Sequence, residues 1–265
     1  SAFYNSGFDE AVGVVVDGAG SWTKFGAEER FLEDYWETET IFNCGYPSKF
    51  DTIYKHIGTK FASPLCYYQR FDNGFWDGYG MVESYESPDC DNCELVATPG
   101  AGIVKTYEAI TEYCGFPSIE AGKTMGLFPY GKEVDYLPRF WKDEGMAPVQ
   151  LADRNTFTPM YPNGALFNAH LIKEVEFCDK EEGQQLYDLQ NRADAAYKVQ
   201  KESQKQVLAL IRKAVEMTGH KNVTLSGGYG LNCVANYYYL DQLKDEGINL
   251  YVEPISNDSG TALGG

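Results

Sequence analysis

Two segments decide the fold: LSGGYGLNCVANYYYL, residues 225–240, and YVEPISNDSGTALGG, residues 251–265. In the first, an apolar, β-rich run ends at Gly227 and Gly228, and a helical pattern follows. In the second, a strand-like run ends in a turn that carries Asp258. Strand, loop, helix, strand and loop in this order predict a layered α/β fold with parallel strands. Because the carboxyl ends of parallel strands meet at one edge of a sheet, we expect both loops to face one ligand.

The rest of the chain supplies similar elements, separated by glycine and proline. Apolar periodicity and stop glycines predict a buried strand at 11–16, a hairpin with one solvated face at 21–43, a helix that ends near Gly115, a long helix at 190–218 that ends at Gly219, and a helix at about 231–244. The stretch at about 45–97 is aromatic, acidic and rich in turn residues, and we expect it to be an insertion. With 265 residues, the chain can form one large α/β domain or two lobes.

The composition is strongly acidic. The chain has 39 Asp and Glu against 22 Lys and Arg, which gives a formal net charge of −17. Such a surface repels phosphate backbones, so we expect no nucleic-acid partner. No apolar run approaches the roughly 20 residues that span a bilayer, and no signal peptide opens the chain. We therefore expect no membrane association and a cytoplasmic location.

The seven cysteines leave one alternative open. Cys90 and Cys93 form a C-x₂-C pair, with Cys44 and Cys66 upstream, and a zinc-bound segment could use them. The second pair of a zinc knuckle is missing and the spacings are irregular, so reduced thiols are favoured over zinc. The chain has only three histidines, which argues against an all-histidine metal site or a Ser/His/Asp triad.

Three strands are predicted to end in loops suited to ligand binding, at 17–20, 226–228 and 257–260. Glycines permit close approach of the backbone to a phosphate, and helix N-termini favour anions. An Asp in such a loop can hold a metal that in turn holds phosphate. The alternative is that each loop only makes a tight turn, but three such loops together favour a binding site.

Four motifs in the same order resemble the O-carbamoyltransferase family, which includes nodulation-factor, tobramycin and cephamycin carbamoyltransferases. They are SAFYNSGFDEAVGVVVDGAGSW at 1–22, GAGIVKTYEAITEYCGF at 100–116, EAGKTMGLFPYG at 120–131, and the run that starts at 225. Only about 45–97 and 133–185 lie outside the similarity.

This resemblance implies an actin/hexokinase-like two-lobed fold, shared with the enzyme that makes threonylcarbamoyladenosine on tRNA. Family members make carbamoyl-adenylate from carbamoyl phosphate and ATP in a C-terminal domain. By this resemblance, the domain seen here would then transfer the carbamoyl group to a hydroxyl of a small-molecule acceptor, at a site with a bound divalent metal, commonly iron. The acceptor and the oligomeric state, a homo-oligomer included, stay open.

The resemblance also assigns roles to individual residues. Asp258 is the implied metal ligand, and Gly227, Gly228 and Asn232 would line the adenylate. Asp17, Gly18 and Gly20 would form the turn on the phosphate side of the ligand. Lys123, Gly126 and Tyr130 would close the pocket from the opposite lobe. Asp17 and Lys123 are the predicted catalytic residues, Lys123 as a point charge for an anion. The metal and these donors would stabilise charge that develops on the carbamoyl oxygen.

The departures from the family pattern predict a partial enzyme. The family's histidine metal pair precedes the segment at which this chain begins, and the adenylate-forming domain follows its end. We therefore expect a carbamoyl-transfer domain that is incomplete at both ends and inactive alone. Tyr229 and Gly230 replace the usual Val-Ala, and Phe128 replaces Ala, which predicts a different pocket shape.

Three other functions stay open. The nearest is a tRNA threonylcarbamoyl transferase, which the acidic charge disfavours. The second is a non-catalytic nucleotide-binding or assembly module of the same fold. A sugar kinase is a weaker third alternative.

Overall fold

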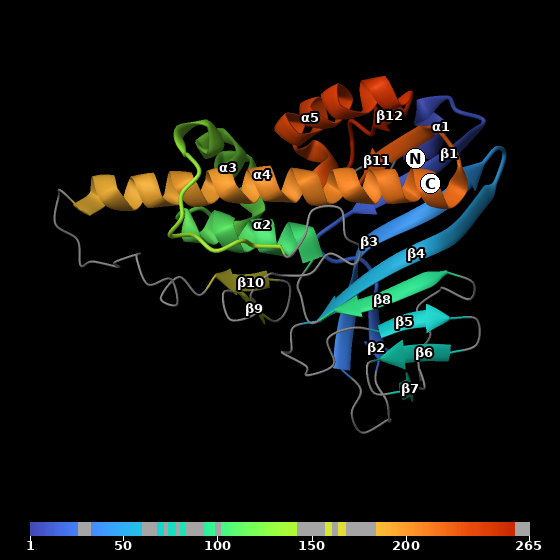
Figure 1. Ribbon diagram of the computed structural model, residues 1–265, viewed down its shortest axis with the longest axis horizontal. Coiled ribbons are helices and arrows are strands. Elements are labelled where there is room, and N and C mark those ends of the chain that lie inside the picture. Colours follow the sequence, from blue (N-terminus) through green and yellow to red (C-terminus); the bar gives the residue numbers. More distant parts are fainter. Residues whose placement is uncertain are drawn as a thin grey trace.

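The computed structural model describes residues 1–25, 33–59, 68–71, 74–77, 80–82, 93–98, 102–141, 157–160, 164–167 and 184–257 (Figure 1). Its strands are β1 (Glu10–Val16), β2 (Trp22–Phe25), β3 (Glu33–Gly45), β4 (Lys49–Thr59), β5 (Tyr68–Phe71), β6 (Gly74–Asp77), β7 (Gly80–Val82), β8 (Glu94–Thr98), β9 (Phe157–Met160), β10 (Gly164–Phe167), β11 (Asn222–Ser226) and β12 (Asn249–Val252). Its α-helices are α1 (Ala2–Ser6), α2 (Gly102–Tyr113), α3 (Ala121–Leu127), α4 (Gln184–Thr218) and α5 (Cys233–Leu243). Short 3₁₀ helices are η2 (Ser118–Glu120), η3 (Phe128–Tyr130), η5 (Gly228–Leu231) and η6 (Lys244–Glu246).

Among the described residues, ten strands form one mixed sheet, in the order β12-β11-β1-β3-β4-β8-β5-β6-β7, with β2 also paired to β3. β1 pairs in parallel with β11, and β11 pairs in parallel with β12. The expected α/β class and the parallel strands at the C-terminal end are therefore confirmed. β3 pairs antiparallel with both β1 and β4, which makes the sheet mixed rather than wholly parallel.

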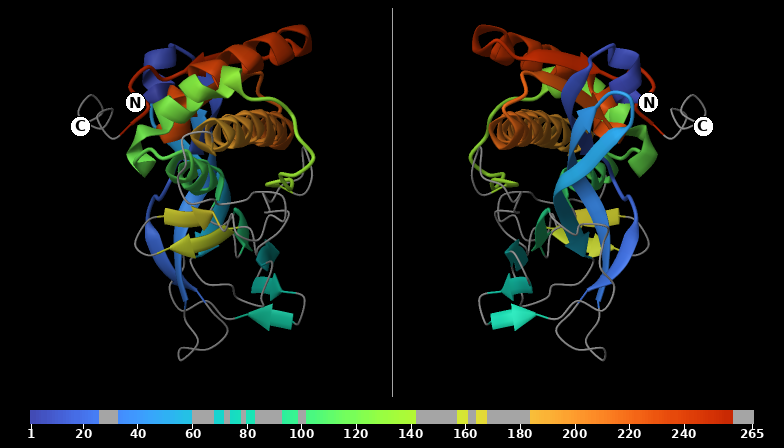
Figure 2. Two further views of the ribbon diagram at one scale, coloured as in Figure 1. Left: turned by 90° about the vertical axis from the view of Figure 1, so that its left-hand side faces the viewer. Right: turned by 90° about the vertical axis from the view of Figure 1, so that its right-hand side faces the viewer.

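At β1, both faces of the sheet are covered. Side chains alternate along a strand, so Val12, Val14 and Val16 pack in the main core with α2 and α4, while Ala11 packs on the other face with Phe3 of α1. Each buried valine stabilises the fold by on the order of 1.5–3 kcal/mol. The long helices thus cover one face of β1 and α1 covers the other (Figure 2).

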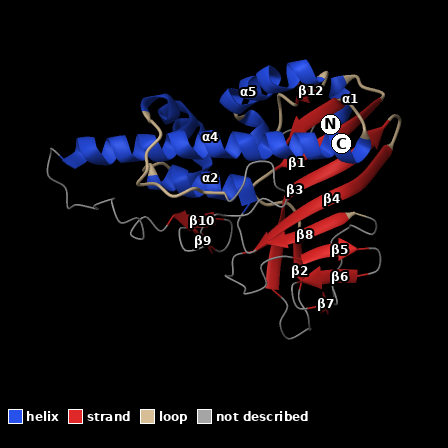
Figure 3. Ribbon diagram, in the orientation of Figure 1, coloured by secondary structure: helices blue, strands red, loops and turns tan. Residues whose placement is uncertain are grey.

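The C-terminal half of the 35-residue helix α4 lies over the sheet, and its N-terminal half extends past the edge of the sheet (Figure 3). The side chains that it buries in the core include Ala196, Val199, Val207, Leu210 and Ile211. This stripe confirms the predicted helical face, and the helix ends as predicted before Gly219, whose φ is +74°. It begins at Gln184 rather than at 190, because no glycine or proline interrupts the preceding residues. No helix within the described ranges is both long and apolar enough to cross a membrane.

β2 and β3 form the predicted antiparallel hairpin, but the predicted solvated face is wrong for β3. Its side chains from Tyr35 to Ile41 are buried or half-buried on both faces. Oε2 of Glu39, which is 1% exposed, is hydrogen-bonded to Nδ1 of the buried His56 on β4. Oε1 of Glu39 accepts the backbone N–H of Ile103 at 3.0 Å. The carboxylate of Glu39 is therefore hydrogen-bonded within the protein, to His56 on one oxygen and to the N-terminus of α2 on the other.

The segment expected to be an insertion contributes to the same sheet. β4 lies beside β3, and β8 pairs in parallel with β4. β5, β6 and β7 continue the sheet outward through antiparallel pairs. Strand β4 therefore links the core around β1 to the distant edge of the sheet (Figure 1).

The cysteines differ in oxidation state. Cys44, Cys114 and Cys233 are free thiols, as predicted. Cys93 is disulfide-bonded, so the prediction of a reduced thiol is wrong at this position. Pairing depends on which cysteines the fold brings within bonding distance, and sequence spacing does not reveal that distance. Cys90, the other cysteine of the predicted C-x₂-C pair, lies outside the described residues.

Candidate functional site

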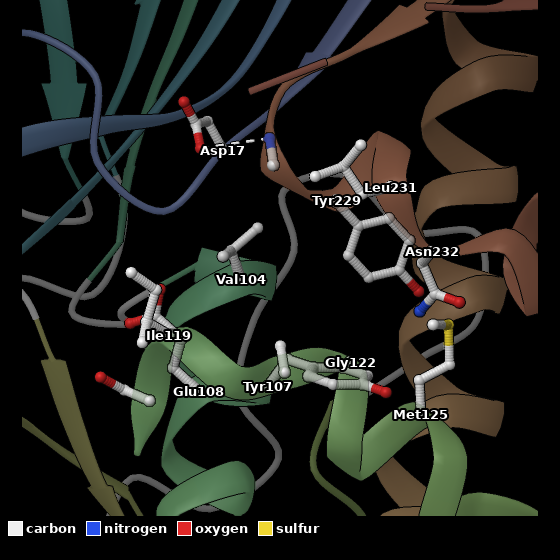
Figure 4. A pocket seen from close by; sticks show the side chains of 13 residues that line it. Asp17, Val104, Tyr107, Glu108, Ile119, Gly122, Met125, Tyr229, Leu231 and Asn232 are labelled. Atoms are coloured by element: carbon white, nitrogen blue, oxygen red, sulfur yellow. Dashed lines mark hydrogen bonds between the residues drawn. The ribbon is translucent and has the colours of Figure 1, made fainter. Parts of the chain in front are cut away.

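A cavity of about 350 Å³ lies at the carboxyl ends of β1 and β11. The end of β1, helix α2, the segment from η2 to α3, and the turn between β11 and α5 line it (Figure 4). In open α/β sheets, ligands bind at this edge, and the volume falls within the range of small-molecule sites. Two of the three loops predicted to suit ligand binding, those after β1 and β11, meet at this cavity. The predicted meeting of the loops after β11 and β12 stays a prediction, because the second loop lies outside the described residues from 258 on.

Asp17 holds these two loops together. Its Oδ1 accepts the backbone N–H of Gly18 at 2.8 Å and that of Gly228 at 3.3 Å (Figure 4). Its own backbone N–H donates to the carbonyl oxygen of Thr38 at 2.9 Å. The carboxylate is thus oriented by the backbone of both loops at the wall of the pocket.

Two glycines permit this close approach. Gly227 has a φ of +90°, and a Cβ there would lie 2.3 Å from the carbonyl oxygen of Val16. A Cβ on Gly228 would lie 3.2 Å from Oδ1 of Asp17. A larger residue at position 227 would force the loop after β11 away from β1. The predicted glycine turn between a strand and a helix is confirmed here, since η5 and α5 follow it.

The loop at 17–20 has a different environment from the one predicted, because a strand and not a helix follows it. The loop lies between β1 and β2, which both pair with β3. Within the loop, the backbone N–H of Gly20 donates to the carbonyl oxygen of Glu37 at 2.9 Å. A Cβ on Gly20 would lie 3.1 Å from Cβ of Glu37. Gly20 therefore serves the close packing of this loop on β3, and the loop leads into β2 and not into a helix whose N-terminus could bind an anion.

Lys105 and Glu108 of α2 lie against this loop, and the sequence pattern did not single them out. A Cβ on Gly18 would lie 3.1 Å from Nζ of Lys105 and 3.3 Å from Oε1 of Glu108. The two side chains form an ion pair at 2.7 Å, and Glu108 also lines the pocket. Burial raises the pKa of Glu108, the ion pair with Lys105 opposes this shift, and the charge of Asp17 adds to it. The sequence shows that Lys105 and Glu108 are three positions apart and can pair on a helix. It does not show that this pair packs against the loop at 17–20.

Two tyrosines form an aromatic wall of the pocket. The rings of Tyr107 and Tyr229 lie edge to face, with centroids 6.3 Å apart. The hydroxyl of Tyr229 is hydrogen-bonded to that of Ser203 at 2.8 Å, and the hydroxyl of Tyr107 donates to Gln200 at 2.8 Å. Burial raises the pKa of both tyrosines, so both hydroxyls keep their protons at neutral pH. This wall presents ring surface to a ligand.

Asn232 lies beside this wall and is the N-cap of α5. Its Oδ1 accepts the backbone N–H of Ala235 at 3.1 Å. The cap fixes the side chain where the turn after β11 meets the pocket (Figure 4). The residues that meet at this edge are therefore two carboxylates, an aromatic pair and an oriented amide.

The family model described as carbamoyltransferase N-terminus matches residues 1–265. The chain belongs to this family. It is 32% identical over 165 residues to the uncharacterized protein sll1178 of Synechocystis sp., a match that covers 60% of this chain and 25% of that protein. It is 27% identical over 165 residues to the nodulation protein NolNO of Sinorhizobium fredii, covering 60% of this chain and 21% of the relative. The chain thus matches no more than a quarter of the length of these relatives.

In this carbamoyltransferase N-terminal domain, α3 lines the pocket, but not through the residues predicted to close it. Gly122 and Met125 of α3 line the pocket, whereas Lys123, Gly126 and Tyr130 do not. The side chain of Lys123 is 54% exposed and pairs with Glu120 at 2.6 Å. Tyr130 is 75% exposed. The roles of these three residues stay predictions.

The predicted metal ligand Asp258 lies outside the described residues. The segment that leads to it passes close to the turn after β11, since a Cβ on Gly230 would lie 2.6 Å from Oγ of Ser256. Within the ranges that the structure describes, no group of three or more His, Cys, Asp or Glu side chains could hold a metal ion. These residues alone therefore do not fit a metal centre, and we derive no step through a metal.

Proposed function

We propose that this domain binds carbamoyl-adenylate and transfers its carbamoyl group to a hydroxyl of a small-molecule acceptor. Carbamoyl phosphate and ATP would supply the adenylate, through a part of the protein outside this chain. Membership of the carbamoyltransferase family supports the reaction class. The pocket between Asp17 and Asn232 is the observation that supports its location.

The shape of the pocket suits an adenylate. Its aromatic wall, Tyr107 and Tyr229, offers ring surface to a planar base, and Asn232 offers an amide to a polar group of the ligand. The glycines beside Asp17 let backbone and ligand approach closely. These features lie at the carboxyl ends of parallel strands, the position that nucleotides occupy in α/β sheets.

The charge of the pocket favours an adenylate over ATP. Asp17 and Glu108 both line it, and Lys105 is already paired with Glu108. A carboxylate repels a triphosphate more strongly than it repels the single phosphate of an adenylate. A divalent cation, iron by resemblance to the family, would reduce this repulsion. Asp258 is the predicted ligand for it.

In the transfer step, the protein has to orient the adenylate and the acceptor, and it forms no covalent bond to either. The acceptor oxygen attacks the carbamoyl carbon, the bond between that carbon and the phosphate oxygen breaks, and AMP leaves with the electron pair. The acceptor proton passes to a base or to water. The oriented carboxylate of Asp17 and the amide of Asn232 would hold the adenylate in place while this occurs.

We also propose that the sheet around β1 belongs to one lobe of an actin/hexokinase-like fold and that the protein acts in the cytoplasm. The parallel order β12-β11-β1, with the pocket at its carboxyl edge, is compatible with that fold. The acidic composition supports a small-molecule acceptor rather than tRNA.

The intact protein tests this proposal. It would be incubated with ATP, labelled carbamoyl phosphate, a divalent cation and a panel of sugars, nucleosides and amino sugars, and carbamoylated products would be detected by mass spectrometry. We expect an acceptor-dependent product that requires both ATP and carbamoyl phosphate. Gly228→Val should lower the rate by about 100-fold, because its side chain would displace Asp17. Gly45→Val is the matched control, because Gly45 lies outside the pocket lining and the nearest atom to its added Cβ is Cβ of Lys49, at 3.4 Å.

Two results would contradict the proposal. One is a folded, intact protein that does not bind AMP. The other is transfer activity that Gly228→Val leaves unchanged, because the reaction would then occur away from this pocket.

A further inference from the structure

Gln200 joins two walls of the pocket without lining it. It lies on α4 and is fully buried. Its Oε1 accepts the hydroxyl of Tyr107 at 2.8 Å and Nδ2 of Asn232 at 3.0 Å. Tyr107 belongs to α2, and Asn232 to the turn before α5 (Figure 4). One amide on the long helix therefore contacts both elements.

The direction of these hydrogen bonds follows from the backbone. The N–H of Ala235 can only donate, so the atom of Asn232 that it meets at 3.1 Å is Oδ1. Nδ2 of Asn232 then faces Gln200, whose atom at 3.0 Å has to be the acceptor Oε1. Nε2 of Gln200 donates back to Oδ1 of Asn232 at 3.2 Å. The two amides are thus paired in one orientation.

Tyr107 and Gln204 complete the same arrangement. Burial raises the pKa of Tyr107 well above its ordinary value, so its hydroxyl keeps the proton that it donates to Gln200. The remaining hydrogen of Gln200 Nε2 points to Oε1 of Gln204 at 3.4 Å. Both acceptor positions and both donor positions of Gln200 are therefore used inside the protein.

Asn232 keeps one donor for a ligand. Its Nδ2 carries two hydrogens, and Gln200 takes one of them. No acceptor for the other occurs among the described residues, and Asn232 lines the pocket. A flipped Asn232 would present an acceptor there instead and would lose its cap to Ala235.

We propose that Gln200 is a positioning residue that orients the Asn232 amide so that the pocket presents a hydrogen-bond donor to an acceptor atom of the bound adenylate. This inference rests on the proposed function. It also assigns the class of ligand atom at Asn232, which is an acceptor such as a ring nitrogen, a ribose oxygen or a phosphate oxygen. Gln200 acts through Asn232 and Tyr107 and does not touch the ligand.

The test substitutes Gln200→Glu in the intact protein and measures the Kd for AMP from pH 5 to pH 8. The introduced carboxylate can still accept from the Tyr107 hydroxyl and from Nδ2 of Asn232. Its second oxygen lies against Oδ1 of Asn232, where Nε2 of Gln200 donates in the wild-type protein. We expect AMP binding about tenfold weaker at pH 8. Protonation of the introduced carboxyl restores a donor, so the deficit should shrink as the pH falls. Gln206→Glu, at a buried glutamine of the same helix outside the pocket lining, is the matched control and should show no such pH-dependent loss.

A second variant covers the case in which Gln200→Glu does not fold. Gln200→Met removes both kinds of contact without adding charge, and it should also weaken AMP binding about tenfold, at every pH. Wild-type protein that does not bind AMP would overturn the proposed function and this inference together. Wild-type protein that binds AMP, with either Gln200 variant binding equally well, would overturn this inference alone.

Discussion

The carboxylate of Asp17 accepts the backbone N–H of Gly228 at 3.3 Å, although 211 positions separate the two residues. The contact is possible because β1 and β11 are parallel neighbours, with Val15 opposite Ser226. Each strand therefore delivers its following loop to the same edge of the sheet. This one bond joins the N-terminal and C-terminal motifs of the domain at the wall of the pocket.

Gly227→Ala should destabilise the fold by on the order of 2–4 kcal/mol, because the new Cβ would lie 2.3 Å from the carbonyl oxygen of Val16 at a φ of +90°. Denaturant unfolding measures this change. Gly126→Ala adds a methyl group with no neighbour within 4 Å and should alter the free energy of unfolding by no more than about 1 kcal/mol. Equal effects of the two substitutions would show that the loop after β11 is not packed as described.

Glu39→Ala should cost on the order of 3–5 kcal/mol of stability. The substitution leaves the buried His56 without its carboxylate and removes the acceptor at the N-terminus of α2. Thermal unfolding measures the loss. As a control, Glu246→Ala removes the half-exposed ion pair with Arg212 and should cost less than about 1 kcal/mol. If Glu39→Ala is as mild as the control, the buried contact does not stabilise the domain.

Binding of an adenylate should weaken as the pH rises through the pKa of Glu108. Burial raises that pKa above the ordinary value of 4.5, so the neutral carboxyl persists at pH values where a solvated Glu has already ionised. Ionisation then places a second negative charge beside Asp17 in the pocket. The affinity for an AMP ester, whose phosphate keeps one charge, should fall over this range, as titration calorimetry can measure. Glu108→Gln should flatten the profile, and an unchanged profile would mean that Glu108 does not face the ligand.

Alkylation should distinguish the described free thiols. Burial raises the pKa of Cys44 to about 11 and that of Cys114 to about 12, so neither should react with iodoacetamide at pH 8 in the folded protein. Cys233 is exposed and follows Asn232 at the pocket, so it should react. Peptide mass mapping measures each site. Bound AMP should slow the reaction of Cys233, and equal rates with and without AMP would argue against binding beside Asn232.

The sequence by itself determined the elements that carry the site. Apolar runs at 11–16 and 222–226 can form stable strands only if they are buried, and the long stripe of α4 can be satisfied only against a sheet. The stop at Gly219 and the turn at Gly227 were visible because only glycine adopts their positive φ without strain. The order of strand, loop, helix and strand from 222 to 252 then predicted that β11 and β12 are parallel, whereas the place of β1 beside β11 came from the structure.

Tertiary structure alone decided which side chains meet there. Periodicity shows which residues share a face but not what covers that face. The hairpin at 21–43 was predicted to have one solvated face, whereas Glu39 is buried and its carboxylate accepts the backbone N–H of Ile103 at the N-terminus of α2. In the same way, Lys123 lies outside the pocket and Glu108 lies in it, although both belong to recognisable helical segments. The position of Gln200 beneath Tyr107 and Asn232 depends on the packing of three helices that are distant in sequence. The local pattern of apolar residues shows which face of a helix or strand is costly to expose to water. Which element covers that face depends on the order of the strands and on how the helices pack across them.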